Sequence, residues 1–420
     1  MILVVFFIWR IFDFLIIFFS RKIIPYLGFF PYKDQLPGFN LPNWIFALAN
    51  FDGLHYILIA RDGYAQYEQA FFPLYPLLIK LLTPLMYNNQ LLTGLIISNV
   101  SFFLGLILFY KYLKLISSDS IRFNPILSIL FLLVFPTSFF FGAIYTEGLF
   151  FLLVVATLYF LKKENYLFTG LFAVFASLTR LVGVFLVIPI IVHLVKKLNY
   201  VIHVKTGIQT KITLNEINRL DPLLRGNDRR YFILNIRYLL LILSPLLGLG
   251  LYCLYLFKTT GDPFFFLTSQ PIFGANRSSH LIFLPQVYWR YFKIFLTANW
   301  NFQYFSSLIE FLVFNFVFVI LVLDLFKNLR IKNCLPAGKA GKLIRNSERL
   351  GLNLFSLVNL ILPTLTGTFS SIHRYSLFSI SLFIYLTDLK NNFIKYLILI
   401  IFIVLHILLL GYFTQGYFIS

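Results

Sequence analysis

Long apolar runs with few interruptions constrain the fold of this chain more than any other feature of its sequence. Runs of about 20 mainly apolar residues, the length that spans a bilayer as a helix, recur from Met1 to Gly411. Apolar residues make up 59% of the chain and charged residues only 12%, and no soluble core could bury that much Phe, Leu and Ile. The sequence therefore predicts an all-α polytopic membrane protein.

The predicted spans are bounded by polar residues, glycines and prolines. One run, 168–195, is too long for an ordinary span and is interrupted by Thr179, Arg180 and Gly183, so we predict two short legs that meet at Arg180. Another apolar stretch, 71–87, is broken by three prolines and a lysine. The other predicted spans are 2–19, 91–110, 124–143, 146–161, 232–257, 306–326, 351–368, 376–388 and 393–414.

Lys and Arg residues, which give the chain a formal charge of +19, gather in five loops between these spans. Such clustering follows the positive-inside rule and does not indicate a nucleic-acid-binding surface. The loops share one side of the membrane only if 168–195 crosses twice and 71–87 does not cross, which predicts about eleven spans with the N-terminus inside. Arg21 and Lys22, on the other side, do not follow the rule. The basic loops are 111–123, 162–167, 196–231, 327–350 and 388–395.

The same topology divides the chain into an N-terminal module, 1–257, whose first outer loop is 20–90, and a C-terminal region, 258–420, with an outer loop at 258–305. The N-terminal run has neither a preceding basic region nor a small-residue cleavage site, so it predicts a retained first helix. The segment 334–342 differs in composition from its surroundings and is interpreted as a tolerated insertion in a cytoplasmic loop.

The two cysteines indicate neither a disulfide nor a metal site. Cys253 lies in a predicted span and Cys334 in a basic loop, and no metal-ligand spacing surrounds them. The sequence also contains no glycine-rich phosphate loop of the Walker or Rossmann type.

Arg10 and Asp13 lie inside the first predicted span, three residues apart, so they can pair along a helix. Charges at that depth cost roughly 2.5–3.5 kcal/mol each. Both should therefore face the bundle interior, either as a structural ion pair or as residues that line a substrate path.

The first outer loop leads to polar residues around Asp52. Prolines and glycines before it prevent a long helix, and the apolar positions from Leu54 onward have the spacing of a short helix lying in the membrane interface. Asp52, His55 and Tyr56 would share one face of that helix. An ionised carboxylate there can accept a proton from an attacking hydroxyl, or it can simply cap the helix. The spacing alone does not choose between these roles.

Three further charged residues are expected near the same face. Glu147 lies at a turn between two apolar spans, where it is either functional or a first-turn acid of the following helix. Arg180 and Arg374 are placed where an anionic head group would lie, and a guanidinium binds phosphate with two parallel hydrogen bonds. Contacts with ordinary lipid phosphates explain either arginine alone. Together with two carboxylates, however, they favour a site for a lipid-linked phosphate.

Four motifs around these residues carry a resemblance to known proteins. They are Phe51-Asp52-Gly53-x-His55-Tyr56-x-x-Ile59-Ala60-x-x-Gly63-Tyr64, Ala70-Phe71-Phe72-Pro73-Leu74-Tyr75-Pro76, Ile144-Tyr145-Thr146-Glu147 and Leu178-Thr179-Arg180. With these motifs the chain resembles the PIG-V type mannosyltransferases and their bacterial relatives, which are membrane glycosyltransferases of the GT-C class. The likeness is strong over residues 45–195 and weaker around His373-Arg374-Tyr375. Phe51 stands where the family usually has Trp.

The resemblance implies a GT-C-like bundle with interfacial helices in the first outer loop. It further implies inverting transfer of a hexose, mannose in this family, from a polyprenyl-phosphate donor to an acceptor hydroxyl. Asp52 matches the family's acidic residue that acts as base. The implied setting is a bacterial-type plasma membrane, with the site facing outward and a lipid-linked or membrane-associated acceptor. The residues expected to contact substrate are His55, Tyr56, Arg61, Asp62, Tyr64, Tyr145, Glu147, Arg180, His373, Arg374 and Tyr375.

A divalent cation held by Asp52, Asp62 or Glu147 is compatible with this interpretation, but no ligand spacing requires one. The acceptor and the oligomeric state are not indicated by the sequence.

Two other functions remain open. The intramembrane residues Arg10, Asp13 and Arg237 suggest a transporter or lipid flippase without glycosyl transfer. Transporters usually have interrupted helices in both halves, whereas here a single run, 168–195, is interrupted, so we rank this hypothesis second. A non-catalytic relative with a degenerate site is the other alternative, although the acidic and basic residues of the motifs are all present.

Overall fold

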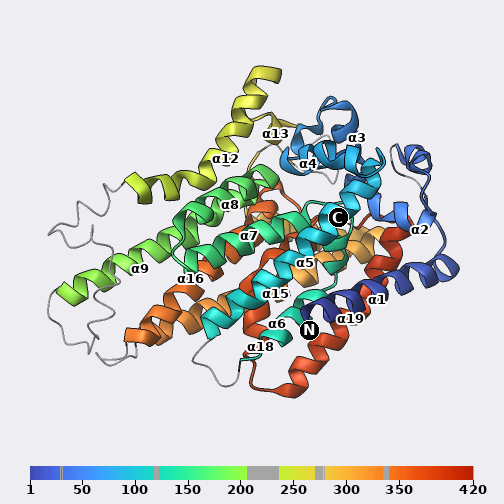
Figure 1. The fold of residues 1–420 in the computed structure, drawn as a ribbon. Coiled ribbons are helices and arrows are strands. Elements are labelled where there is room, and N and C mark those ends of the chain that lie inside the picture. The colour runs from blue at the N-terminus through green and yellow to red at the C-terminus, as the bar shows by residue number, and fades with distance from the viewer. Residues whose placement is uncertain are drawn as a thin grey trace.

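The computed structural model describes residues 1–28, 30, 32–117, 123–205, 236–269, 278, 280–333 and 340–419. Across these ranges the chain forms α-helices, short 3-10 helices and loops, and no strand. The long helices lie side by side in an elongated bundle (Figure 1). The predicted all-α fold class of a polytopic membrane protein is confirmed.

Six of the described helices are long and apolar enough to cross a membrane. They belong to α1 (Ile2–Ile23), α5 (Gln90–Ser117), α12 (Ile236–Thr260), α15 (Phe302–Asn333), α16 (Ala340–Ile361) and α19 (Asn392–Thr414). The other predicted crossings correspond to α6 (Pro125–Leu133), α7 (Glu147–Lys162), α8 (Tyr166–Thr179), α9 (Val187–Lys205) and α18 (Ile380–Thr387).

The loop between α1 and α5 folds into short helices instead of a further long one. The apolar stretch 71–87 contains only a nine-residue α-helix followed by a 3-10 turn, because its prolines interrupt the backbone hydrogen-bond ladder. The elements of this loop are η1 (Lys33–Phe39), α2 (Asn43–Phe46), η2 (Ala47–Ala49), α3 (Asp52–Asp62), η3 (Glu68–Ala70), α4 (Leu74–Leu82) and η4 (Thr83–Leu85).

The run 168–195 breaks where the sequence predicts. Helix α8 ends at Thr179, Arg180 is extended with φ −154° and ψ 143°, and η6 (Leu181–Leu186) leads into α9. A Cβ on Gly183 would lie 2.5 Å from the carbonyl carbon of Ala176, so only glycine allows the two legs to approach this closely. The break places the Arg180 side chain at the end of the bundle.

The predicted span 124–143 is also interrupted. Helix α6 ends at Leu133, and η5 (Ser138–Gly142) completes the segment after Pro136. The remaining short elements are α13 (Phe265–Thr268), α14 (Leu284–Thr297), η9 (Leu362–Thr366), α17 (Ile372–Tyr375) and η10 (Ser376–Phe378). Residues 334–339 of the predicted insertion and most of the basic loop 196–231 lie outside the described residues.

The two ends of the bundle differ in the charges that they carry. At one end, Glu348 accepts hydrogen bonds from Lys162 at 2.8 Å and from Lys196 at 2.7 Å. At the other end, the first loop meets the turn before α7, where the Ile144 amide donates to the Leu48 carbonyl at 3.0 Å. The positive-inside rule likewise predicts that the basic loops and the first outer loop lie on opposite sides of the membrane.

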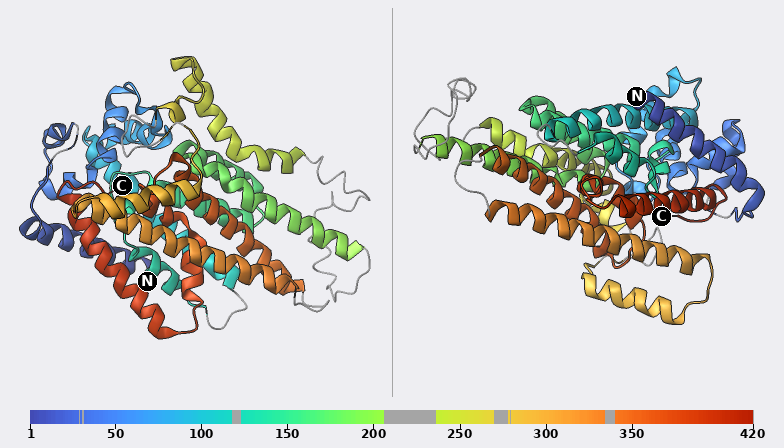
Figure 2. Two further views of the ribbon diagram at one scale, coloured as in Figure 1. Left: turned by 180° about the vertical axis from the view of Figure 1, so that it is seen from behind. Right: turned by 90° about the horizontal axis from the view of Figure 1, so that it is seen from below.

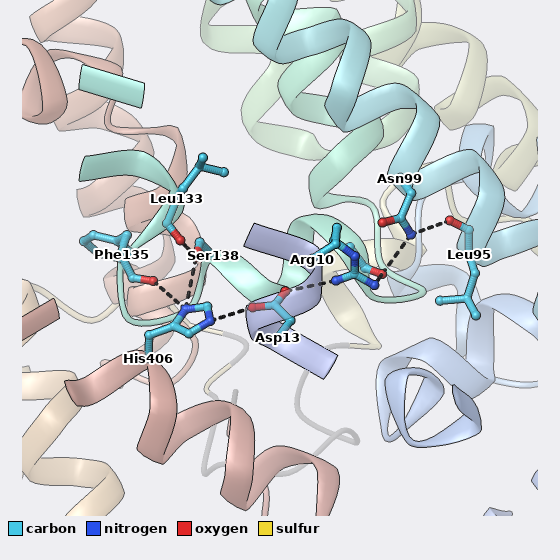
Figure 3. Close-up of polar contacts among 9 residues, drawn as sticks. Arg10, Asp13, Leu95, Asn99, Leu133, Phe135, Ser138 and His406 are labelled. Carbon is cyan, nitrogen blue, oxygen red and sulfur yellow. Dashed lines mark hydrogen bonds and ion pairs between the residues drawn. The ribbon is translucent and has the colours of Figure 1, made fainter. Parts of the chain in front are cut away.

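Arg10 and Asp13 form the predicted ion pair, with Arg10 Nη1 3.0 Å from Asp13 Oδ2 (Figure 3). Both side chains are buried, and Asp13 Oδ1 lies 2.8 Å from His406 Nε2 of α19. The other ring nitrogen of His406 is 3.1 Å from Ser138 Oγ in η5. Within the described residues the pair also reaches Gly142 of η5, to whose carbonyl Arg10 Nη2 donates at 3.4 Å, and these contacts support a structural role that joins α1, α19 and η5.

Candidate active site

The backbone before α3 fixes the position of Asp52. Asn50 donates from Nδ2 to the Phe413 carbonyl at 3.0 Å, and its own carbonyl accepts from the Tyr145 hydroxyl at 2.7 Å. Phe51 has φ +59° and ψ −118°, a backbone conformation with positive φ that is uncommon outside glycine. A Cβ on Gly53 would lie 3.0 Å from the Ile144 carbonyl oxygen. The first turn of α3 is therefore held tightly against the turn before α7.

Asp52, Arg374, Glu147 and Arg180 form one chain of alternating charges, which we call the charge network. Arg374 donates from Nη1 to Asp52 Oδ2 at 2.7 Å and from Nε to Glu147 Oε1 at 3.0 Å. Arg180 donates from Nη1 to the same Glu147 oxygen at 2.6 Å. Four residues from α3, α7, α17 and the α8–η6 break thus meet at one end of the bundle.

The members of the charge network differ in exposure, and Glu147 is the most buried of the four. The side chain of Asp52 is 31% exposed, those of Arg374 and Arg180 are 8% and 11% exposed, and that of Glu147 is fully buried. Two carboxylates and two guanidiniums balance in formal charge, which makes their burial tolerable. Asp52 is therefore the more accessible of the two carboxylates.

Aromatic rings surround the two guanidinium groups. The Arg374 guanidinium lies 4.6 Å from the ring centroid of Tyr145 and 4.8 Å from that of Phe140. The Arg180 guanidinium lies 4.8 Å from the Tyr375 ring. These cation–π contacts fix the planes of both guanidiniums.

Arg374 and Arg180 differ in how many of their guanidinium nitrogens already contact a carboxylate or hydroxyl oxygen. Arg374 directs Nε and Nη2 to Glu147 and Nη1 to Asp52. Arg180 donates hydrogen bonds only from Nη1, to Glu147 and to Thr146 Oγ1 at 3.2 Å, within the described part of the chain. Arg180 is therefore the arginine with hydrogen-bond donors available for a ligand.

His55 and Tyr56 lie beside Asp52 on α3, as the spacing predicts. His55 Nδ1 is 2.9 Å from Glu68 Oε1, whose second oxygen accepts from the Ala65 amide at 3.0 Å. Tyr56 is buried, and burial together with the negative charge of Asp52 raises the pKa of its hydroxyl. Tyr56 thus remains a neutral phenol next to the carboxylate.

Arg61 and Asp62 lie away from the charge network, and Tyr64 follows them in the chain. Arg61 and Asp62 pair with each other, Nη2 to Oδ2 at 2.8 Å, and this hydrogen bond lowers the pKa of Asp62. They are at the opposite end of α3 from Asp52, about 14 Å along the helix axis. Tyr64 donates to the Phe71 carbonyl at 2.8 Å. Among the described residues, no group of three or more His, Cys, Asp or Glu side chains is arranged to hold a metal ion.

The triplet 373–375 forms most of the short helix α17. Arg374 joins the charge network, the Tyr375 ring packs on Arg180, and the buried His373 offers its carbonyl to Thr137 Oγ1 at 2.8 Å. His373 Nδ1 is buried and has no hydrogen-bond partner among the residues that the structure describes. The weak sequence match at this triplet therefore locates two residues that contact the network.

Sequence reasoning missed Asn50 and Glu68, which hold Asp52 and His55 in place. Asn50 stands directly before the first motif and Glu68 between the first two. Their polarity in a mainly apolar chain could have identified them, because a buried polar group needs a hydrogen-bond partner and here would find one in the site.

Comparison with known proteins gives one match. A protein-family model described as Mannosyltransferase (PIG-V) matches residues 9–255, more than half of the chain. Neither the curated proteins nor the solved structures contain a match. The matched range includes Asp52, Glu147 and Arg180 and ends before Arg374.

Proposed function

This chain belongs to the mannosyltransferase (PIG-V) family, and on that premise we propose that it transfers mannose from a polyprenyl-phosphate donor to a membrane-bound acceptor hydroxyl. Membership makes the protein a glycosyltransferase of the membrane that uses a sugar donor and a lipid-linked acceptor. The donor class, the inverting course and the base are our proposals. The observation that carries them is a part-exposed carboxylate at one end of the charge network and a guanidinium with spare donors at the other.

Asp52 acts as the general base in this proposal. The acceptor oxygen attacks the anomeric carbon of the sugar from the face opposite the phosphate while its proton passes to Asp52. The bond between the anomeric carbon and the phosphate oxygen breaks, and its electron pair leaves with the polyprenyl phosphate. Because that leaving group is already a stabilised anion, no protonated acid is needed, and nearby guanidiniums suffice to stabilise the developing charge.

Arg180 binds the donor phosphate. Its Nε and Nη2 groups are uncommitted within the described residues, whereas all three nitrogens of Arg374 are engaged by carboxylates. Arg374 instead orients Asp52, to whose Oδ2 atom it donates from Nη1 at 2.7 Å. A guanidinium held by one corner presents its remaining N–H groups as a fork that fits phosphate oxygens.

We further propose that this end of the bundle faces away from the cytoplasm, in a bacterial-type plasma membrane. The support is the charge at the opposite end, where Lys162, Lys196 and Arg349 gather around Glu348 and Asp388. Basic residues favour the cytoplasmic side.

Replacing Arg180 by lysine is expected to raise the KM for the lipid donor about tenfold, with a smaller change in kcat. Lysine keeps a positive charge beside Glu147 but cannot offer a planar fork to phosphate. The measurement is the initial rate against concentration of polyprenyl-phosphate-mannose in proteoliposomes. Arg349→Lys is the matched control, because Arg349 pairs with Asp388 at 2.7 Å at the other end of the bundle. If the donor KM is unchanged in Arg180→Lys but raised in Arg374→Lys, then Arg374 and not Arg180 binds the donor phosphate.

The function itself is tested by incubating the purified, reconstituted protein with radiolabelled polyprenyl-phosphate-mannose and a membrane lipid extract. Formation of a labelled glycoside supports the proposal, and identifying the product reveals the acceptor. Transfer from nucleotide-linked mannose alone would contradict the donor class. Movement of the lipid across the vesicle without any glycosidic product would favour the transporter alternative.

A further inference from the structure

The position of Arg374 depends on a short loop, 367–371, between η9 and α17. Two of its residues have left-handed backbone conformations, Gly367 with φ +91° and Ser371 with φ +66°. Ser371 directly precedes α17, and its carbonyl accepts from the Arg374 amide at 3.0 Å. Any shift of this loop therefore moves the guanidinium that contacts Asp52 and Glu147.

Residues of the 258–305 loop hold this segment by its backbone. The amides of Ser278 and Ile282 each donate at 2.9 Å to carbonyls of η9, those of Thr366 and Leu365. Arg290 of α14 donates from Nη1 to the Gly367 carbonyl at 3.1 Å. The loop that carries Arg374 is thus joined to α14, which lies beside one end of α15 at the edge of the bundle (Figure 2).

Tyr291 makes the most specific of these contacts. Its hydroxyl donates to Glu310 Oε2 at 2.6 Å and accepts from the Phe369 amide at 3.1 Å. It also lies 3.3 Å from Thr368 Oγ1, and its ring is 4.7 Å from that of Phe369. Tyr291 and Glu310 are both buried. A phenol that donates to a carboxylate is polarised and accepts a second hydrogen bond more strongly.

Besides Arg290, which holds the Gly367 carbonyl, several other side chains of α14 do not share this role. Trp289, Phe292 and Leu296 are exposed, as expected of an amphipathic helix at a membrane interface. Tyr288 is hydrogen-bonded too, but its hydroxyl donates to Asn315 Oδ1 at 2.7 Å, on α15. Tyr291 alone of these two tyrosines joins α14 and α15 to the 367–371 loop by a hydroxyl hydrogen bond.

We propose that Tyr291 is a positioning residue for sugar transfer, which holds the 367–371 loop so that Arg374 contacts both Asp52 and Glu147. The inference rests on the proposed function for its kinetic consequence. Tyr291 acts through the Phe369 amide and does not itself touch substrate.

The test compares Tyr291→Phe with Tyr288→Phe. Each substitution removes one hydroxyl from α14 and one hydrogen bond to α15, but only Tyr291→Phe releases the Phe369 amide. We expect Tyr291→Phe to lower kcat about tenfold with little change in the donor KM, because a small displacement of a catalytic group slows the reaction. Tyr288→Phe should retain the wild-type kcat.

A second measurement does not depend on the reaction. Amide hydrogen exchange of the peptide covering 367–375 should be faster in Tyr291→Phe than in the wild-type protein, and unchanged in Tyr288→Phe. Equal exchange in both variants overturns the positioning role. Faster exchange in Tyr291→Phe together with no transfer from polyprenyl-phosphate-mannose by the wild-type protein would leave the mechanical link intact and refute the proposed function instead.

If Tyr291 acts through Arg374, the effects of substituting the two residues should not add. In an Arg374→Lys background, Tyr291→Phe should cause no additional loss of kcat, since its target is already removed. Full additivity of the two losses would show that Tyr291 acts by another route.

Discussion

Replacement of Asp52 by asparagine is expected to reduce the rate of sugar transfer by about 10²- to 10⁴-fold, the range that a general base contributes. Asparagine has nearly the same shape, and its amide oxygen can still accept the hydrogen bond that Arg374 donates to Asp52 Oδ2. What it cannot do is take the proton of the acceptor hydroxyl. The effect should therefore appear in kcat at saturating donor, measured by product formation in proteoliposomes.

The control for this variant is Asp34→Asn, which makes the same substitution at an exposed carboxylate of η1 in the same loop. It should leave the rate unchanged. Wild-type activity in Asp52→Asn, with the protein correctly inserted, would exclude Asp52 as the base and return it to the role of a helix-terminal acid.

Truncation of Glu147 to alanine should destabilise the protein by about 3–5 kcal/mol, the usual cost of leaving a buried charge without its partner. Glu147 Oε1 is the only carboxylate oxygen that Arg180 contacts in the described chain, and it also accepts from Arg374. Without it, two nearly buried guanidiniums lie beside each other with Asp52 as their one remaining counter-charge. The measurement is thermal unfolding of the purified protein in detergent, which should show a lower melting temperature.

Two variants calibrate that result. Glu147→Gln keeps an acceptor oxygen and should lose less stability than Glu147→Ala. Glu164→Ala removes a carboxylate that is 53% exposed and paired with Lys197, and exposed pairs contribute little. Equal melting temperatures for Glu147→Ala and Glu164→Ala would mean that the charge network does not stabilise the fold.

The sequence predicts the general architecture well because the membrane imposes simple rules. Apolar length indicates the helices, and the sidedness of lysine and arginine requires the break at Arg180, which the structure contains. The same rules place Asp52, Glu147, Arg180 and Arg374 at one end, where their contacts lie. Each of these predictions depends only on local composition and on whether the number of membrane crossings between two loops is odd or even. Such predictions do not require knowledge of which helices pack against each other.

Details of the site were beyond the sequence because they depend on long-range contacts. The sequence assigns Arg180 and Arg374 the same expected role. Only their contacts show that all three nitrogens of Arg374 contact carboxylates, whereas Arg180 donates from Nη1 alone within the described residues. The same is true of Tyr291, which lies 78 residues from the Phe369 amide that it accepts from. Arg61 and Asp62, which were expected from the sequence to contact substrate, pair with each other at the far end of α3.

The order in which the ribosome makes the four charged residues has a consequence for biogenesis. Glu147 and Arg180 belong to helices made early, and their pair is neutral on its own, so it can form while the rest of the chain is still being translated. Asp52 can contact Arg374 only after α17, far later in the chain, has been synthesised. A nascent chain that stalls before that point therefore lacks an assembled charge network, and it should be inactive in sugar transfer.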